Sequence, residues 1–175
     1  MGAAKVTTAR SCFRGPARRS VTSPAIAVSQ SAQLGLPMQP KLSIIVPMYN
    51  EQENVTPLYR AIIDAVAKLG YPFEIIFVDD GSADRTVAIA TELACRDPRL
   101  RIVKFRRNYG QTAAMAAGIE YARGEIVVTM DGDLQNDPED IGAFVSKIEE
   151  GYDLVVGWRY NRQDKLVSRK IPSGV

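Results

Sequence analysis

The chain has 175 residues, which fits one domain of ordinary size, and 46% of them are hydrophobic, which is enough to form a core. It contains no histidine, and this excludes Ser-His-Asp and Cys-His catalysis as well as histidine-based metal sites. The net charge of +2 is unevenly spread: residues 41–158 carry 12 basic and 19 acidic side chains between two basic ends, a pattern that argues against nucleic-acid binding.

Residues 1–40 hold five basic residues, no acidic residue and no sustained apolar period, so we expect a flexible basic leader. An Arg- and Ser-rich start without acids is also typical of an organellar transit peptide, and an extension without a role is the other interpretation. No stretch of the sequence approaches the roughly 18 apolar residues that a membrane-spanning helix needs.

From Leu42 onward, short apolar runs alternate with segments of helical spacing. In chain order they predict a strand at 42–47, a helix at 53–69, a strand at 73–78, a helix at 85–95, a strand at 100–105, a helix at 111–122, a strand at 125–130, a helix at 138–150 and a strand at 153–156. This alternation predicts an α/β fold with a mostly parallel central sheet flanked by helices.

Polar residues follow three of these strands, in segments 47–51, 79–82 and 131–135. In open α/β sheets, ligands bind outside the carboxyl ends of the strands. The sequence therefore predicts that the three segments meet at one ligand site.

Asp131 and Asp133 come directly after a buried strand, with Gly132 between them. Two close carboxylates repel each other unless a cation lies between them, and Mg²⁺ or Mn²⁺ is commonly held by one or two carboxylates plus phosphate oxygens. Gln135 adds a neutral oxygen. The alternative is that both aspartates only cap the helix near Pro138, for which Asn136 or Asp137 is better placed.

Segments 79–82 and 47–51 each allow two interpretations. Asp79-Asp80-Gly81-Ser82 forms a turn before a helix, yet one cap needs a single acceptor, and the second carboxylate would suit a nucleobase, a ribose or support of a metal ligand. Segment 47–51 is either a helix start capped by Asn50 or a loop whose Tyr49 ring stacks on a base.

Together these segments resemble family-two glycosyltransferases of the nucleotide-diphospho-sugar transferase (GT-A) fold, and most of all their polyprenyl-phosphate branch. The resemblance extends from residue 41 to the end of the chain. It rests on five segments in family order, which are residues 43–51, 76–82, 107–111, 130–135 and 156–162.

The resemblance implies a role for each matching residue. It implies a metal, Mg²⁺ or Mn²⁺, on Asp131, Asp133 and Gln135, with Asp131, Asp133 and Arg159 as catalytic residues. It implies binding of substrate by Pro47, Tyr49, Asn50, Glu51, Asp79, Asp80, Gly110, Gln111, Arg159, Arg162 and Arg169. The arginines would meet phosphate charge, for which the planar guanidinium is suited.

The implied reaction is inverting transfer of a sugar from a nucleotide-diphosphate donor to a polyprenyl phosphate, at the cytoplasmic face of a membrane. Segment 107–111 resembles the bacterial lipid-linked glucosyl type more than the mannosyl type, and this resemblance implies a UDP-sugar rather than a GDP-sugar donor. A lipid phosphate is already anionic, so little general-base catalysis is needed, which agrees with the absence of histidine. The resemblance is also compatible with a homo-oligomer.

Members of this branch continue beyond the point where the chain stops, so residues 41–175 are expected to form a donor-binding catalytic domain that is incomplete on its acceptor side. Two alternatives stay open: a glycosyltransferase acting on a polysaccharide or another soluble acceptor, and a noncatalytic sugar-nucleotide-binding module. A nucleotidyltransferase is disfavoured, because segment 47–51 is not a glycine-rich loop with Arg and Lys. A Rossmann dehydrogenase is disfavoured because no Gly-x-Gly-x-x-Gly follows the first strand.

Overall fold

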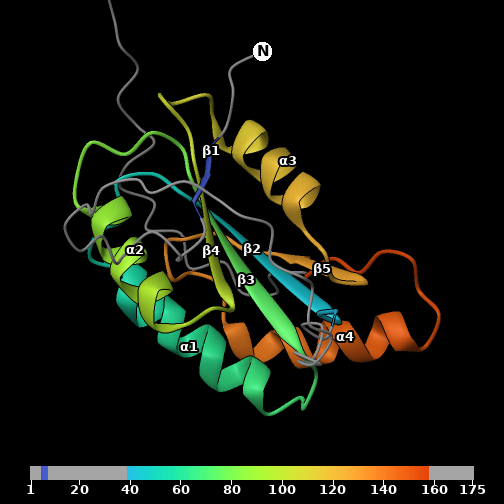
Figure 1. Cartoon of the computed structure of the whole chain (residues 1–175). Helices are drawn as coiled ribbons and strands as arrows, with labels where there is room; N and C mark the ends of the chain where they lie inside the picture. The colour runs from blue at the N-terminus through green and yellow to red at the C-terminus, as the bar shows by residue number, and fades with distance from the viewer. Residues whose placement is uncertain (1–4, 8–38, 158–175) are drawn as a thin grey trace, which may run out of the picture.

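The structure, a computed structural model, describes residues 5–7 and 39–157. Its centre is a five-stranded sheet in the order β1-β4-β3-β2-β5 (Figure 1). Four strands are parallel, and β1 pairs antiparallel with β4 at one edge. The strands are β1 (Lys5–Thr7), β2 (Leu42–Met48), β3 (Phe73–Asp79), β4 (Leu100–Lys104) and β5 (Ile126–Thr129).

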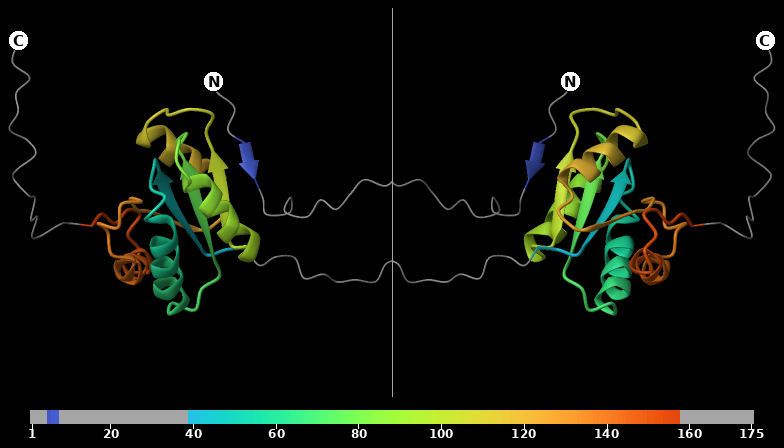
Figure 2. Two further views of the ribbon diagram at one scale, coloured as in Figure 1. Left: turned by 90° about the vertical axis from the view of Figure 1, so that its left-hand side faces the viewer. Right: turned by 90° about the vertical axis from the view of Figure 1, so that its right-hand side faces the viewer.

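Helices cover both faces of the sheet (Figures 1 and 2). Apolar side chains of α1, α2 and α4 form the core on one face, while Ala114 of α3 packs with Ile45 and Val103 on the other. The helical elements are α1 (Val55–Ala67), α2 (Thr86–Arg96), α3 (Gln111–Tyr121), the 3-10 turn η2 (Pro138–Asp140) and α4 (Ile141–Glu149).

The two central strands, β2 and β3, are buried along their whole length. This is expected for parallel strands with helices on both faces, and it explains why their sequences are continuous apolar runs rather than alternating ones. Their register pairs Met48 with Asp79, so both strands end level with each other. The loops that follow β2 and β3 therefore start side by side.

Helix α3 approaches the sheet closely because its packing face consists of small residues. A Cβ atom added at Gly118 would collide with the side chain of Ile45 on β2. Ala114, one turn earlier, has no exposed surface. Close packing against β2 holds the first residue of α3, Gln111, near the carboxyl end of the sheet.

Eight of the predicted elements are present with shifts of a few residues, and the predicted helix 138–150 is divided into η2 and α4. The prediction of a strand at 153–156 is wrong. This segment forms no ladder with any described strand, and Leu154 and Val156 are 77% and 78% exposed. An apolar run alone does not form a strand, because each strand needs a hydrogen-bonded neighbour. Strand β1 lies within residues 1–40, where no strand was predicted, because three residues are too few to show the apolar pattern of a strand.

None of the helices in the described residues is long and apolar enough to span a bilayer.

Candidate active site

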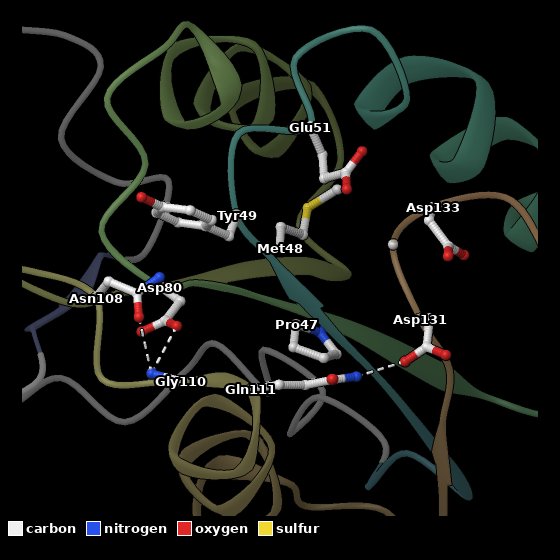
Figure 3. A pocket seen from close by; sticks show the side chains of 11 residues that line it. Pro47, Met48, Tyr49, Glu51, Asp80, Asn108, Gly110, Gln111, Asp131 and Asp133 are labelled. Atoms are coloured by element: carbon white, nitrogen blue, oxygen red, sulfur yellow. Dashed lines mark hydrogen bonds between the residues drawn. The ribbon is translucent and has the colours of Figure 1, made fainter. Parts of the chain in front are cut away.

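A cavity of about 360 Å³ opens at the carboxyl edge of the sheet, where the loops after β2, β3, β4 and β5 meet (Figure 3). Its size is within the range of small-molecule sites. The residues that line it are Pro47, Met48, Tyr49, Glu51, Asp80, Asn108, Gly110, Gln111, Asp131, Gly132 and Asp133. Residues more than 80 positions apart in sequence therefore share one pocket.

Most of the substrate and metal residues expected from the sequence line this cavity: Pro47, Tyr49, Glu51, Asp80, Gly110, Gln111, Asp131 and Asp133. Asn50, Asp79 and Gln135 do not line it. Arg159, Arg162 and Arg169 lie outside the described residues. Three lining residues, Met48, Asn108 and Gly132, were not predicted to bind substrate or metal, although each stands inside one of the five family-like segments.

Asn50 braces the loop after β2 against the loop after β3. Its backbone N–H donates to Ser82 Oγ at 2.9 Å, and its Oδ1 accepts from the Ala83 N–H at 2.9 Å. Its φ of 56° is in the left-handed region, which asparagine tolerates better than most residues. Its side chain thus holds the neighbouring Tyr49 and Glu51 in place, and it does not cap the helix that follows.

Asp84 also connects the loop after β2 to the loop after β3. Its Oδ2 accepts from the Gln52 N–H at 3.2 Å and its Oδ1 from the Thr86 N–H at 2.9 Å. Burial alone would raise the pKa of Asp84, but the hydrogen bonds from Thr86 and Gln52 outweigh it and lower that pKa. The carboxylate therefore stays ionised as a fixed acceptor between the two loops.

Asp79 and Asp80 have different roles although they are adjacent. Both oxygens of Asp79 accept from the Ser82 N–H at 3.3 Å, which closes the turn. Asp80 is only 3% exposed, and its two oxygens accept from the backbone N–H groups of Tyr109 at 2.7 Å and Gly110 at 2.9 Å. Asp80 thus ties the loop after β4 to the loop after β3, and the same carboxylate faces the cavity (Figure 3).

Asp131 and Asp133 reach the cavity from the loop after β5. Asp131 Oδ1 accepts from Gln111 Nε2 at 2.6 Å, and Asp133 Oδ1 accepts from the Gln135 N–H at 3.0 Å. The helix-capping alternative fails, because Asp137 is the residue that accepts from the Glu139 N–H at the start of η2.

Gly132 brings this pair of aspartates close to β2. A Cβ atom added there would lie 3.0 Å from the backbone oxygen of Pro47, so a larger residue would push the loop away. The signal for Gly132 in the sequence was its place between two aspartates. Its contact with Pro47, which explains why glycine is needed there, depends on the fold.

Four carboxylates line the cavity, those of Glu51, Asp80, Asp131 and Asp133, and its described lining contains no lysine or arginine. Glu51 accepts a hydrogen bond from Asn54 Nδ2 at 2.5 Å. The hydrogen bonds described for Glu51 and the three aspartates thus come from uncharged N–H groups. Oxygen ligands of this kind suit a hard divalent cation. No group of three or more His, Cys, Asp or Glu among residues 5–7 and 39–157 forms a metal site by itself.

Comparison with known proteins gives the family. The family model described as Glycosyl transferase family 2 matches residues 43–174, most of the chain. The chain belongs to this family. The resemblance read from the five segments is thereby confirmed, and so is the expected fold of a parallel sheet flanked by helices, as in GT-A glycosyltransferases.

Two relatives are similar to this chain in sequence. It is 51% identical over 135 residues to the dodecaprenyl-phosphate galacturonate synthase of Rhizobium johnstonii, covering 76% of this chain and 40% of the relative. It is 46% identical over 134 residues to the undecaprenyl-phosphate 4-deoxy-4-formamido-L-arabinose transferase of Pectobacterium atrosepticum, covering 75% of this chain and 40% of that relative. The chain thus spans about 40% of the length of these relatives.

Among solved structures, S. aureus TarS (residues 1–349) is similar in fold, with a TM-score of 0.50 and 29% sequence identity. The match covers 63% of this chain and 32% of the TarS chain.

Proposed function

We propose that this family-two glycosyltransferase binds a nucleotide-diphosphate sugar together with a divalent cation and transfers the sugar to a polyprenyl phosphate. The names of the two relatives support the acceptor class, because each name includes a polyprenyl phosphate. In this proposal residues 41–175 bind the donor, and residues 1–40 precede the catalytic domain.

The observation that carries the proposal is the charge of the cavity. Four carboxylates meet there without a lysine or arginine in the described lining, so a diphosphate would be repelled unless a cation came with it. When bound, the cation would neutralise the diphosphate that leaves during transfer. Asp131 and Asp133 are the residues that would hold it.

The remaining lining residues divide by position around the cavity. Tyr49, Glu51 and Asp80 lie on the side of β2 and β3, and we assign them to the nucleoside (Figure 3). Gln135 stays a predicted ligand whose side chain does not line the cavity. The preference for a UDP-sugar, the inversion of the anomeric centre and the phosphate contacts of Arg159, Arg162 and Arg169 also stay predictions.

An anionic acceptor would not need a general base from the protein. A phosphate monoester oxygen is ionised near neutral pH and attacks without losing a proton to the protein, so the cavity needs to orient the two substrates more than it needs a base. Transfer to a membrane lipid would place the site at the cytoplasmic face of a membrane.

Calorimetry with UDP and GDP, each with and without Mg²⁺ or Mn²⁺, tests the donor side. We expect binding only with a metal, and its loss in Asp133→Asn. Binding of equal strength without metal would refute the metal-bridged donor site. For the acceptor side, transfer of a labelled sugar to a polyprenyl phosphate in detergent is compared with transfer to soluble glycans, and exclusive use of the glycans would refute the lipid acceptor.

A further inference from the structure

The segment 108–111 connects the two sides of the cavity. At one end, the N–H groups of Tyr109 and Gly110 donate to the carboxylate of Asp80. At the other end, Gln111 Nε2 donates to Asp131 Oδ1 at 2.6 Å. Figure 3 shows the Gln111 side chain extended toward Asp131, below Pro47 in this view, with Asp80 on the other side of the picture. The segment therefore spans from the loop after β3 to the loop after β5.

The backbone of this segment is firmly held. Asp80 accepts a hydrogen bond from Gly110, which directly precedes α3 and whose φ of 93° suits glycine. The packing of Gly118 against Ile45 fixes the position of the helix itself. Gln111 is the first residue of that helix, so the starting point of its side chain is determined from both directions. Its amide reaches Asp131 from a rigid base.

A neutral amide has a specific consequence for the carboxylate that it contacts. The N–H group holds Asp131 Oδ1 and so fixes the orientation of the carboxylate, but it adds no positive charge. The full negative charge of Asp131 remains available to a cation. A lysine or arginine at position 111 would orient the same oxygen and compete with the metal.

We propose that Gln111 is a positioning residue for Asp131, and that segment 108–111 links donor binding beside Asp80 to cation binding beside Asp131. The inference rests on the proposed function, since it requires a cation at Asp131. It assigns to Gln111 a contact with Asp131 in place of the direct contact with substrate expected from the sequence.

The test compares Gln111→Leu with Thr112→Leu, which puts the same side chain at the next exposed position of α3. Mn²⁺ affinity in the presence of UDP is measured by electron paramagnetic resonance of free Mn²⁺. Loss of a partner that orients a metal ligand weakens metal binding about 10- to 100-fold, so we expect at least about a tenfold loss in Gln111→Leu and none in Thr112→Leu. The urea midpoint should stay unchanged in both variants, which separates positioning from general stability.

A double-mutant cycle with Asp131→Asn gives the decisive readout, because a residue that acts through Asp131 has nothing to add once that carboxylate is lost. Gln111→Leu should then cause no further loss of affinity. Asp80→Asn, which weakens the hydrogen bond from the Gly110 N–H, should also lower the Mn²⁺ affinity, as Gln111→Leu does.

The outcomes separate the two proposals. If the unaltered protein binds UDP with Mn²⁺ and Gln111→Leu changes the affinity less than about threefold, the positioning role is overturned and the proposed function stands. An equal loss in Thr112→Leu, or full additivity with Asp131→Asn, also overturns the positioning role. If the unaltered protein shows no metal-dependent binding of nucleotide, both proposals fail.

Discussion

The loop after β4 lies directly on Gly81, so closely that a Cβ atom added at Gly81 would be 2.7 Å from the Cα of Arg107. Gly81 also has a φ of 78°, which disfavours any residue with a side chain. This contact places Tyr109 and Gly110 within hydrogen-bonding distance of Asp80. One glycine therefore sets the separation of two loops that form the cavity.

Gly81→Ala is expected to lower the free energy of unfolding by about 2 kcal/mol or more, because backbone strain and a clash with backbone atoms act together. It should also weaken nucleotide binding, since the loop of Tyr109 and Gly110 has to move. Urea denaturation and calorimetry measure the two effects. Gly70→Ala is the control: Gly70 has a φ of 71° but nothing within 4 Å of the added Cβ, so it should lose about 1 kcal/mol and leave binding intact.

Gly132→Ala should weaken metal-dependent nucleotide binding by about tenfold, because the added Cβ, 3.0 Å from the Pro47 backbone oxygen, displaces Asp131 and Asp133. The matched control is Gly142→Ala, whose Cβ would meet only the flexible end of Leu69 at 3.1 Å. Calorimetry with UDP and Mn²⁺ compares the two variants. Equal affinities would show that the aspartates tolerate displacement.

Glu74 lies at the opposite end of the sheet from the cavity, and the residue is 2% exposed. It accepts from Ser43 Oγ at 2.9 Å, from Arg101 Nη1 at 2.8 Å and from Arg123 Nη2 at 2.7 Å. Glu74→Gln should cost about 3 kcal/mol of unfolding free energy, because it leaves the guanidinium groups of the mostly buried Arg101 and the half-exposed Arg123 facing a neutral amide. Glu120→Gln on the exposed side of α3 is the control, and urea denaturation at pH 7 is the measurement.

The pH dependence of stability follows from the same group. Burial would raise the pKa of Glu74, but the hydrogen bonds from Arg123, Arg101 and Ser43 outweigh it and hold that pKa below its usual value of 4.5. A lowered folded-state pKa contributes stability that is complete above the unfolded pKa and is lost as the pH falls through the folded one. Below about pH 4.5, the unaltered protein should therefore lose stability more steeply than Glu74→Gln. Parallel curves from pH 6 to pH 3 would contradict this.

Tyr59 of α1 donates its hydroxyl to Asp97 Oδ2 at 2.7 Å. Burial and this hydrogen bond raise the pKa of Tyr59 to about 12. The neutral phenol is thus stabilised in the folded state, and its contribution is lost as the pH rises from about 10 through 12. Tyr59→Phe should cost about 1 kcal/mol at pH 7 and flatten the stability curve above pH 10. Thermal melts across this range measure both effects.

The sequence alone determined the parallel strands, the helices between them and the two aspartate clusters. Buried apolar runs and helical spacing are local patterns, and the carboxyl ends of parallel strands share one edge by geometry, so the sequence is enough to place Asp80 and Asp131 at one site. The predicted strand at 153–156 failed for the complementary reason, because a strand depends on a neighbour that no local pattern specifies.

Only the tertiary structure decided which polar groups face the cavity and which hold its loops together. Asn50 and Asp80 belong to similar polar segments, yet Asn50 bonds to the Ala83 backbone outside the cavity lining, whereas Asp80 lines the cavity and bonds to Gly110. The hydrogen bond from Gln111 to Asp131 joins residues 20 positions apart, and its length depends on how closely α3 packs on β2. Such distances result from side-chain packing across the sheet, and for this reason they could not be read from the order of residues along the chain.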